Sequence, residues 1–364
     1  MRVALVHYWL VTMRGGEKVL EALCRMYPNA DIYTHVLDRS CLTPELARHN
    51  IQTTFINKLP FSRKLYQKYL PLMPLALERL PLLDYDLVIS SESGPAKGVI
   101  TRSDALHVCY CHTPMRYLWD HYYDYYARAG FLSRMGMNVC TPALRRWDVH
   151  SATMVDSIVA NSSTVAQRIR KRWRRDAAVI HPPVNVDAFP TREKVGGDYY
   201  VCFGQLVHYK RFDLAIDACS RMGRRLVVVG DGEEMARLRA RAGSTVYFAG
   251  RQPHERVLEY LRGAKALLFP GEEDFGIVPV EATASGVPVI AYGCGGVKET
   301  VVPELNGCFF EEQSVPSLMA SIEAFEREEY NFDPHAMHRY ALRFSEERFR
   351  QEFMAHTEAA FARL

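Results

Sequence analysis

The sequence contains no long hydrophobic run. No segment reaches the roughly 18 apolar residues that a membrane span needs, and the first ten residues, MRVALVHYWL, lack the apolar stretch of a secretory signal peptide. These absences predict a cytoplasmic protein that meets a membrane, at most, on its cytoplasmic face. The formal net charge is only +3 over 364 residues, which argues against nucleic acid as a partner.

Metal-binding and dinucleotide-binding motifs are also missing or misplaced. The nine cysteines have no CxxC spacing, so we expect reduced thiols and no zinc site. Asp84-Tyr85-Asp86 has the DxD spacing of a metal-binding motif, but it precedes a predicted strand, at the wrong end for a ligand site. Met235 stands where a dinucleotide fingerprint after Gly230 would have its third glycine. We therefore expect no catalytic metal and no cofactor.

Short apolar runs alternate with helical patterns along the chain, which predicts α/β architecture with two doubly wound, Rossmann-like parallel sheets. Two prolines within 181–187 mark the junction, so the predicted domains are residues 1–182 and 183–345, with a terminal helix, roughly 346–363, of open packing within 346–364. A ligand cleft between the two domains is expected. The predicted strands are 2–7, 86–90, 106–111 and 157–160 in the first domain, and 199–203, 225–229, 245–249, 266–269 and 288–291 in the second.

The strongest motif has two acids, Glu273 and Glu281, with seven residues between them, after one of these strands. Gly276 permits a tight turn, and the residues after it predict a helix that reaches Ala284. The bare N–H groups and positive dipole end of that helix suit a diphosphate, and the flanking carboxylates can accept hydrogen bonds from sugar hydroxyls. Taken alone, either acid would more simply be a solvated surface residue.

A second motif follows strand 199–203 and ends with the cations Lys210 and Arg211 before a helix. Positive charge at a helix start is unfavourable unless an anion lies there, so these residues predict a phosphate contact. Lys210 offers a compact charge and Arg211 a forked one. The alternative is a solvated basic helix start.

The first domain has weaker candidates. Gly15 and Gly16 follow the first strand and would let the backbone approach a ligand, although a tight loop alone explains them equally well. His112 follows strand 106–111, at the end where ligands bind in open α/β sheets. A lone histidine is more often structural than functional.

Together these motifs resemble the retaining glycosyltransferases of family four, which have the two-domain GT-B fold. The resemblance spans nearly the whole chain and rests on the glycine-rich loop, GQLVHYKRFD at 204–213, VVGDG at 228–232 and the two-glutamate motif. It implies a nucleotide-sugar donor held mainly by the second domain and an acceptor by the first. The implied catalytic residues are His112, Glu273 and Lys210, and the implied donor-binding residues are Gly15, Gly16, Gln205, Lys210, Arg211, Phe275, Gly276, Ile277 and Glu281.

The resemblance assigns roles to some of these residues. Glu273 would contact the donor sugar, Glu281 the ribose, and the amides near Gly276 the sugar and diphosphate. His112 would help to position the sugar. Many family members have arginine where this chain has Gln205, so one phosphate contact is expected to be weakened or supplied by another residue.

The 205–213 run and the CHTPMRY segment look most like mannosyltransferases that build bacterial surface polysaccharides. GDP-mannose is therefore the expected donor and a lipid-linked saccharide the expected acceptor. A UDP-sugar-dependent enzyme, a sugar-nucleotide epimerase and a non-catalytic nucleotide-sugar binding protein remain as alternatives. Two segments that mix basic and large apolar residues, 58–73 and 168–175, suggest contact with an anionic membrane, although a core-facing helix with a basic outer side explains each as well.

Overall fold

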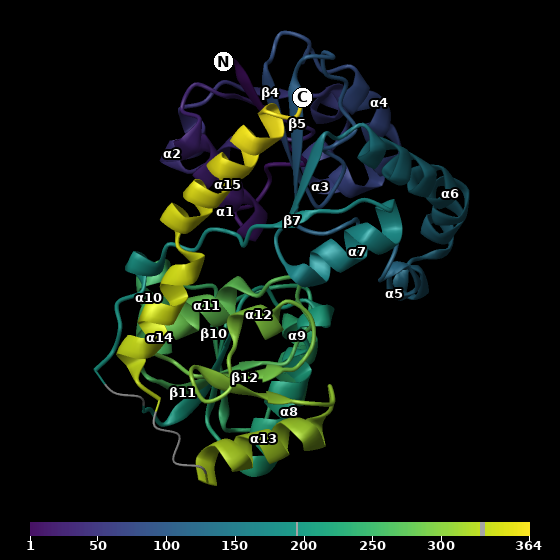
Figure 1. The fold of residues 1–364 in the computed structure, drawn as a ribbon. Coiled ribbons are helices and arrows are strands. Elements are labelled where there is room, and N and C mark those ends of the chain that lie inside the picture. Colours follow the sequence, from purple (N-terminus) through teal and green to yellow (C-terminus); the bar gives the residue numbers. More distant parts are fainter. Residues whose placement is uncertain (194–195, 328–331) are drawn as a thin grey trace. The chain divides into compact units, whose positions relative to one another are not determined.

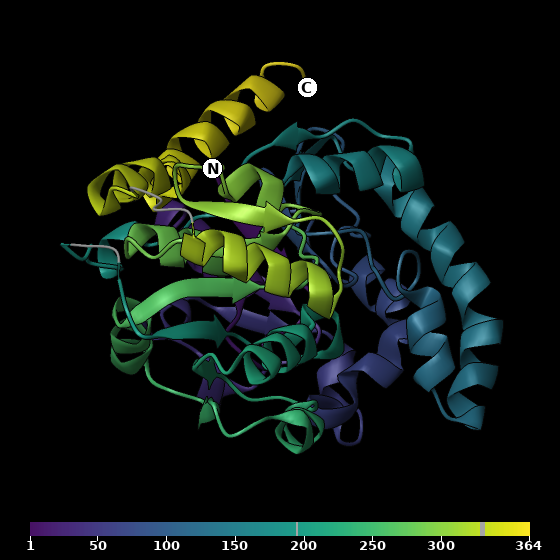
Figure 2. The same ribbon diagram turned by 90° about the horizontal axis from the view of Figure 1, so that it is seen from below.

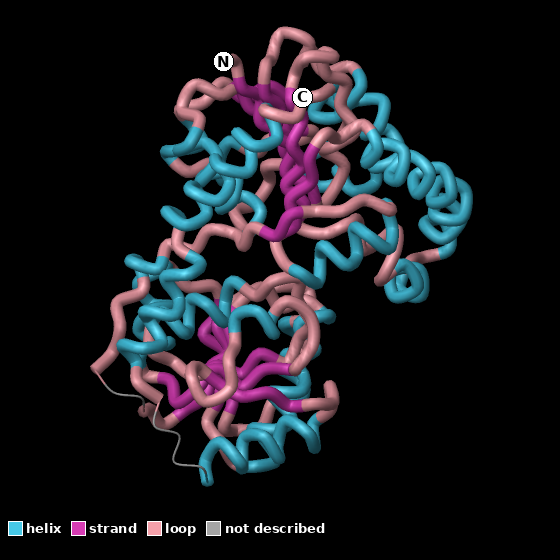
Figure 3. The backbone as a smooth tube through the Cα atoms, viewed as in Figure 1, coloured by secondary structure: helices cyan, strands magenta, loops and turns pink. Residues whose placement is uncertain are grey.

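The computed structural model of the chain describes residues 1–193, 196–327 and 332–364. These residues form two compact α/β units (Figure 1): Met1–Pro183 together with Phe349–Leu364, and Val184–Arg348. Each unit has its own parallel sheet with helices around it (Figure 3). Within the described residues, no helix is long and apolar enough to cross a membrane.

The first unit contains a seven-stranded parallel sheet in the order β3-β2-β1-β4-β5-β6-β7. Its strands are β1 (Val3–His7), β2 (Asp31–Thr34), β3 (Ile51–Thr53), β4 (Leu87–Glu92), β5 (Leu106–Cys111), β6 (Ser157–Ala160) and β7 (Ala178–Val179). Its helices are α1 (Gly15–Met26), α2 (Pro44–Ala47), α3 (Ser62–Leu65), α4 (Met73–Glu78), α5 (Tyr122–Arg128), α6 (Phe131–Thr153) and α7 (Ser163–Trp173), joined at the end by α15 (Glu346–Phe361). Strands β1, β4 and β5 are buried along their whole length, as expected where helices cover both faces of a parallel sheet.

Strand β4 differs from the sequence prediction at its end. The prediction stopped at Ser90 because the next two residues, Ser91 and Glu92, are polar, yet the structure continues the strand through both and buries them. Each has a polar partner inside the unit, and this pairing offsets the cost of removing polar groups from water. Strands β2, β3 and β7 escaped prediction because they have only four, three and two residues.

A fully buried ionic cluster lies beside the end of β4. The ammonium group of Lys97 is 3.2 Å from Glu92 Oε1 and 2.5 Å from Asp148 Oδ1. The indole N–H groups of Trp119 and Trp173 donate to the other oxygen of Asp148, at 2.7 and 2.8 Å. Glu92 also accepts the backbone N–H groups of residues 96 and 97, so the cluster fixes the loop that follows β4.

The C-terminal helix α15 packs on the first unit, beside α1 in Figure 1. Its buried Phe349 and Phe353 stack on each other at 5.6 Å and meet the ring of Tyr110 from β5 at 5.6 and 6.2 Å. Ser157 on β6 and His356 add a hydrogen bond of 2.8 Å. The chain therefore returns to its first unit after completing the second.

The second unit contains a six-stranded parallel sheet in the order β10-β9-β8-β11-β12-β13, which is a doubly wound arrangement. Its strands are β8 (Tyr199–Phe203), β9 (Leu226–Val229), β10 (Val246–Gly250), β11 (Ala264–Phe269), β12 (Val289–Tyr292) and β13 (Gly307–Phe310). Its helices are α8 (Phe212–Met222), α9 (Met235–Arg241), α10 (His254–Arg262), α11 (Ile277–Ala284), α12 (Val297–Thr300), α13 (Val315–Arg327) and α14 (Pro334–Ala341). The five predicted strands of this unit are present with shifts of no more than two residues, and β13 is an additional edge strand.

Candidate functional site

Loops of the second unit meet at the carboxyl ends of its strands. The loop after β9 packs so closely on the loop after β8 that a side-chain carbon at Gly230 would collide with the carbonyl oxygen of Gly204. The loop after β12 is tied to the loop after β11 by a hydrogen bond of 2.9 Å from Gly296 N to the carbonyl oxygen of Glu273. Ligands in doubly wound sheets bind at this end of the strands.

Helix α11 begins at this edge directly after Gly276, whose φ of +93° lies in the left-handed region that favours glycine. No side chain caps the helix start. The ring of Phe275 is buried and packs edge-on against Phe344 at 5.5 Å, so only the backbone of Phe275 is available to a ligand. Ile277 is the first helical residue, and Glu281 lies one turn further on with 5% of its surface exposed.

The side chains of Lys210 and Glu273 form an ion pair at this helix start, with 2.9 Å between Lys210 Nζ and Glu273 Oε1. Both are largely buried, with side-chain exposures of 15% and 18%. Burial alone would lower the pKa of Lys210, but the charges of Glu273 and, more weakly, Glu281 outweigh it and raise the pKa above its ordinary value of 10.5. Lys210 and the two glutamates therefore converge on one place and do not face separate surfaces.

The other two polar candidates on the loop after β8 are placed differently. Arg211 has a left-handed backbone, and its guanidinium group donates to both carboxylate oxygens of Asp213, at 3.1 and 3.2 Å, and to Gln313 at 3.2 Å. These contacts hold Arg211 at the start of α8 within the protein. Gln205 is partly exposed and lies beside the Gly204 backbone. The structure thus brings Lys210, but not the head group of Arg211, to the glutamates.

The first unit has a polar network at the carboxyl edge of its own sheet. Ser91 Oγ, at the end of β4, lies 2.8 Å from His112 Nε2 and 3.0 Å from His7 Nδ1 at the end of β1. The remaining nitrogen of His7 lies 3.9 Å from a carboxylate oxygen of Glu17 in α1. Burial, together with the neighbouring His7, lowers the pKa of His112 to about 3, so His112 is a neutral imidazole near pH 7.

Gly15 and Gly16 form the first turn of α1 beside this network. A Cβ atom at Gly16 would collide with the hydroxyl group of Tyr8 and lie 3.6 Å from His112 Nε2. The backbone N–H of Arg14 donates to Glu17 at 3.0 Å, which fixes the helix start. The predicted residues Gly16 and His112 are therefore neighbours.

The sequence analysis missed His7, Ser91 and Glu17. The signal was present for His7, which follows its strand at the same edge as His112, but a single histidine in the apolar VALVH segment gave no pattern. Ser91 and Glu17 are ordinary polar residues in the sequence. Only the parallel pairing of β1 with β4, which sets His7 opposite Ser91, brings them together.

The DxD motif is at the amino end of β4, as the sequence indicated. Asp86 accepts hydrogen bonds of 2.8 Å from the backbone N–H of Arg2 and from the guanidinium group of Arg102. These partners explain the acid as a structural residue. They also lower the pKa of Asp86, first through the Arg2 backbone and then through Arg102.

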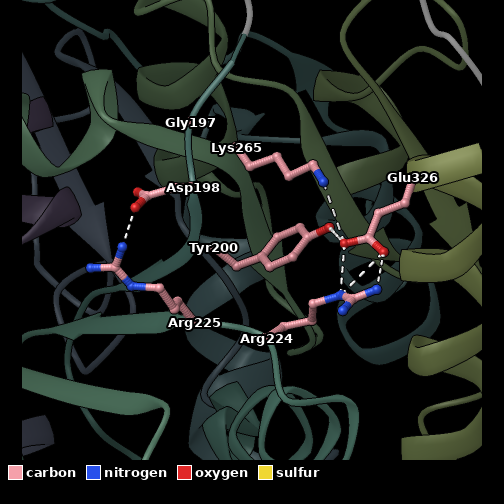
Figure 4. Close-up of a pocket in the computed structure, with 7 residues that line it drawn as sticks. All are labelled: Gly197, Asp198, Tyr200, Arg224, Arg225, Lys265 and Glu326. Atoms are coloured by element: carbon pink, nitrogen blue, oxygen red, sulfur yellow. Dashed lines mark hydrogen bonds and ion pairs between the residues drawn. The ribbon is translucent and has the colours of Figure 1, made fainter.

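A different charged group lies at the amino edge of the second sheet (Figure 4), around a cavity of about 290 Å³. Glu326 is 2.7 Å from the guanidinium group of Arg224 and 3.4 Å from the ammonium group of Lys265. Tyr200 donates a further hydrogen bond of 3.0 Å to Glu326. Since these groups satisfy one another, the cluster is a structural counterpart to the Lys210–Glu273 pair in the same unit.

Comparison with known families divides the chain in the same way as the fold. Residues 13–188 match the family described as Glycosyltransferase Family 4, and residues 185–344 match Glycosyl transferases group 1. Together the two family models cover 13–344. The chain belongs to the family-four glycosyltransferases with the GT-B fold.

Individual relatives are more distant. The chain is 31% identical over 216 residues to a GDP-mannose-dependent alpha-mannosyltransferase of Mycobacterium tuberculosis (strain CDC 1551 / Oshkosh), a match that covers 55% of this chain and 57% of that protein. It is 28% identical over 180 residues to the D-rhamnosyltransferase WbpZ of Pseudomonas aeruginosa, covering 44% and 46%. The matches thus span about half the length of these curated relatives.

Solved structures resemble the chain over its whole length. The lipopolysaccharide outer core galactosyltransferase WaaB in its apo form has a TM-score of 0.70 and 18% identity, covering 100% of both chains. Anabaena Alr3699/HepE in complex with UDP and glucose has a TM-score of 0.73 and 16% identity, covering 98% of this chain and 99% of that one. At these identities the likeness concerns the fold alone.

Proposed function

We propose that this protein transfers a hexosyl group from a nucleoside-diphosphate sugar to an acceptor hydroxyl group. The observation that carries the proposal is the convergence of Lys210, Glu273 and Glu281 at the uncapped start of α11. An ammonium group and a helix start bind a diphosphate, and two carboxylates accept hydrogen bonds from sugar hydroxyls. Membership of a glycosyltransferase family supports the same conclusion.

Each group has a distinct task in the proposed reaction. Lys210 and the amides of Gly276 and Ile277 stabilise the negative charge that develops on the departing diphosphate. Glu273 orients the hexose, and Glu281 receives the ribose hydroxyls. Gln205 and Arg211 remain donor-binding predictions, with Arg211 supporting the loop through Asp213 instead of meeting phosphate in the unliganded arrangement.

We propose a retaining reaction that uses no metal. The bond from the anomeric carbon to the diphosphate oxygen breaks, the acceptor oxygen forms a bond to the same face of that carbon, and the acceptor proton moves to the departing phosphate oxygen. The protein contributes positioning and charge stabilisation to this step.

The network in the first unit suggests how His112 acts. Ser91 has one hydroxyl proton but faces two imidazole nitrogens, so one histidine must donate to Ser91 while the other accepts. The Glu17 carboxylate near His7 Nε2 favours the proton on that nitrogen, which leaves His7 Nδ1 to accept from Ser91. His112 then donates from Nε2 and keeps Nδ1 as an acceptor for a substrate hydroxyl group.

For the substrate, we propose GDP-mannose as donor and a lipid-linked saccharide as acceptor. The similarity to a GDP-mannose-dependent enzyme from M. tuberculosis supports the donor, although the relative WbpZ is named for a different sugar. A UDP-sugar is the competing donor. The GT-B fold is equally compatible with both nucleotides, because the residues identified above contact sugar and diphosphate and not the base.

The test is to incubate the protein with a panel of GDP- and UDP-hexoses, with and without a lipid-linked acceptor, and to measure nucleotide release and sugar transfer. Release that depends on the acceptor supports transfer, with EDTA having no effect, and NMR of the product gives the anomeric configuration. Conversion of the free donor without acceptor would instead indicate an epimerase. Binding without either product would indicate a non-catalytic protein.

Glu273→Gln tests the site itself. The substitution keeps the size of the side chain but removes the charge, and we expect transfer to fall at least ~100-fold. Glu326→Gln is the matched control, because it removes an equivalent acid from a lysine in the same unit but at the opposite edge of the sheet. Equal turnover in the two variants would exclude Glu273 from the site.

A further inference from the structure

Helices α5 and α6 expose six large apolar side chains at the outer edge of the first unit, where Figure 2 shows them side by side. We call these six residues the α5–α6 patch: Tyr123, Tyr125, Phe131, Leu132, Met135 and Val139. Phe131, Leu132 and Val139 are 78%, 78% and 75% exposed. Single exposed apolar residues are ordinary, but a group of this size on two consecutive helices marks an interaction surface.

The patch lies on the side of α6 that faces away from the fold. At about 100° per residue, Phe131, Leu132, Met135 and Val139 fall within one quarter to one third of the helix circumference. The buried residues of the same helix, Thr141, Leu144, Asp148, Ser151 and Ala152, lie on the opposite side. The apolar face therefore does not serve the core of this unit.

The helices that carry the patch are held in place without it. Arg134 donates to the carbonyl oxygens of Tyr126 and Ala127, at 3.0 and 2.7 Å, which fixes the turn between α5 and α6. Arg145 donates to the carbonyl oxygen of Leu118 at 2.7 Å and lies 4.7 Å from the ring centre of Tyr122. The exposed face is thus presented by a preformed support.

The charges around the patch are one-sided. Residues 121–147 contain four arginines, one aspartate, and no lysine or glutamate. Arg128 is exposed between the two helices, and Arg146 is exposed two turns beyond Val139 on the same side of α6. Phenylalanine and leucine on one face, with tyrosines and arginines near them, form the composition of a helix that lies in the interface of an anionic membrane.

We propose that the α5–α6 patch inserts into the surface of a membrane that contains anionic lipids. A stable protein partner would need roughly 20–30 residues on each side, and this patch is a narrow strip with cations at its border. The proposal goes beyond the transfer reaction and does not depend on it, although a membrane-bound protein would reach a lipid-linked acceptor more readily.

The structure makes the two segments first considered for membrane contact less suitable. In 168–175, Trp173 is buried and its indole donates to Asp148, so it provides no interfacial anchor. Arg170 and Arg172 in the same segment pair with Asp176 and Asp120. In 58–73, Phe61 is exposed, but the segment consists of short helical turns and has no continuous apolar face.

Vesicle flotation of the full-length protein tests the proposal. The probes are vesicles of phosphatidylethanolamine and phosphatidylglycerol in equal parts, and vesicles of phosphatidylcholine alone. We expect flotation with the anionic vesicles and at least ~10-fold weaker binding by Phe131→Ser/Leu132→Ser, because two large apolar groups no longer leave water. Leu83→Ser, which alters a residue 58% exposed elsewhere in the same unit, should float like the unaltered protein.

A second measurement locates the inserted residues. Phe131→Trp should gain fluorescence quenching by brominated lipid, and Leu83→Trp should not. Unchanged flotation of the double serine variant would overturn the proposal, as would no flotation of the unaltered protein. Concentration-dependent self-association that the serine variant abolishes, without vesicle binding, would assign the patch to a second copy of the chain instead. None of these measurements uses a sugar donor, so their failure leaves the proposed transfer reaction untouched.

Discussion

Replacing Lys210 by methionine removes the only charge of the ammonium group while keeping most of the length of the side chain. In the unaltered protein this group lies 2.9 Å from Glu273 and is 15% exposed. The substitution therefore has two effects that must be separated. It leaves Glu273 without its cation, and it withdraws the proposed stabilisation of the departing diphosphate.

The distance gives the size of the first effect. At an effective dielectric constant of about 20, two unit charges 2.9 Å apart attract each other by about 6 kcal/mol, before the cost of desolvating them is subtracted. Breaking a buried pair by removing one partner typically costs about 3–5 kcal/mol of stability. The raised pKa of Lys210 has the matching sign, since its contribution is present below pH 10.5 and is lost only as pH rises through the higher folded-state value.

The second effect concerns turnover. Removing one preorganised group that faces developing negative charge lowers turnover by about 10²–10³-fold. Lys265→Met is the matched control, since Lys265 also pairs with a glutamate in this unit, at 3.4 Å and at the other edge of the sheet. We expect it to cost less stability, because Lys265 is 37% exposed, and to leave turnover within about twofold.

The assay combines thermal unfolding with steady-state kinetics on the donor that the panel identifies. Lys210→Met/Glu273→Gln should recover much of the lost stability, because no unpaired charge remains, but none of the lost turnover. Turnover of Lys210→Met equal to that of Lys265→Met would refute the assignment of Lys210 to the leaving group. Recovery of turnover in the double variant would show that Lys210 serves only to balance Glu273.

Two further predictions concern the first unit. Ser91→Ala removes the hydroxyl group that joins His7 to His112, and we expect kcat to fall about tenfold with little change in the unfolding temperature of the unit; Ser90→Ala, whose hydroxyl group meets His107 instead, should retain turnover, and equal losses in both would remove Ser91 from the site. Acid should destabilise this unit, because burial lowers the pKa of His35 to about 4 and, with nearby positive groups, those of His107 and His112 to about 3. The unfolded chain then binds more protons as pH falls below 6.5, and stability should drop by up to about 1.4 kcal/mol per pH unit for each histidine. Calorimetry at pH 7 and pH 5 measures the change, and equal unfolding temperatures would contradict the buried neutral state.

The fold was predictable because its main strands are buried on both faces. Such strands form continuous apolar runs, and both LVVV in β9 and VALVH in β1 are visible without a structure. Strands at the edges of the sheets, such as β3 and β13, have mixed exposure and gave no such run. The packing of α15 was open for a different reason, since an amphipathic helix shows that it has a partner but not which sheet supplies it.

The site divides in the same way. Glu273, Gly276 and Lys210 were found because residues close in sequence define a turn, a helix start and a charge. Arg211 was assigned to phosphate on the same basis, but a left-handed backbone and the nearby Asp213 direct its guanidinium group elsewhere. A sequence gives the residues of a loop more readily than the direction in which each side chain leaves it.

The two polar edges also differ in charge, and this difference bears on how the proposed reaction is shared. The first unit offers His7, Ser91 and a neutral His112, which exchange hydrogen bonds with hydroxyl groups but do little to stabilise a phosphate. The second unit offers the Lys210 ammonium group and an uncapped helix start. If the diphosphate binds the second unit, substitutions there should weaken the binding of nucleotide alone, whereas Ser91→Ala should leave it unchanged and slow only the transfer of sugar. Calorimetric titration with the nucleoside diphosphate separates the two, and weakened nucleotide binding by Ser91→Ala would show that the diphosphate also depends on the first unit.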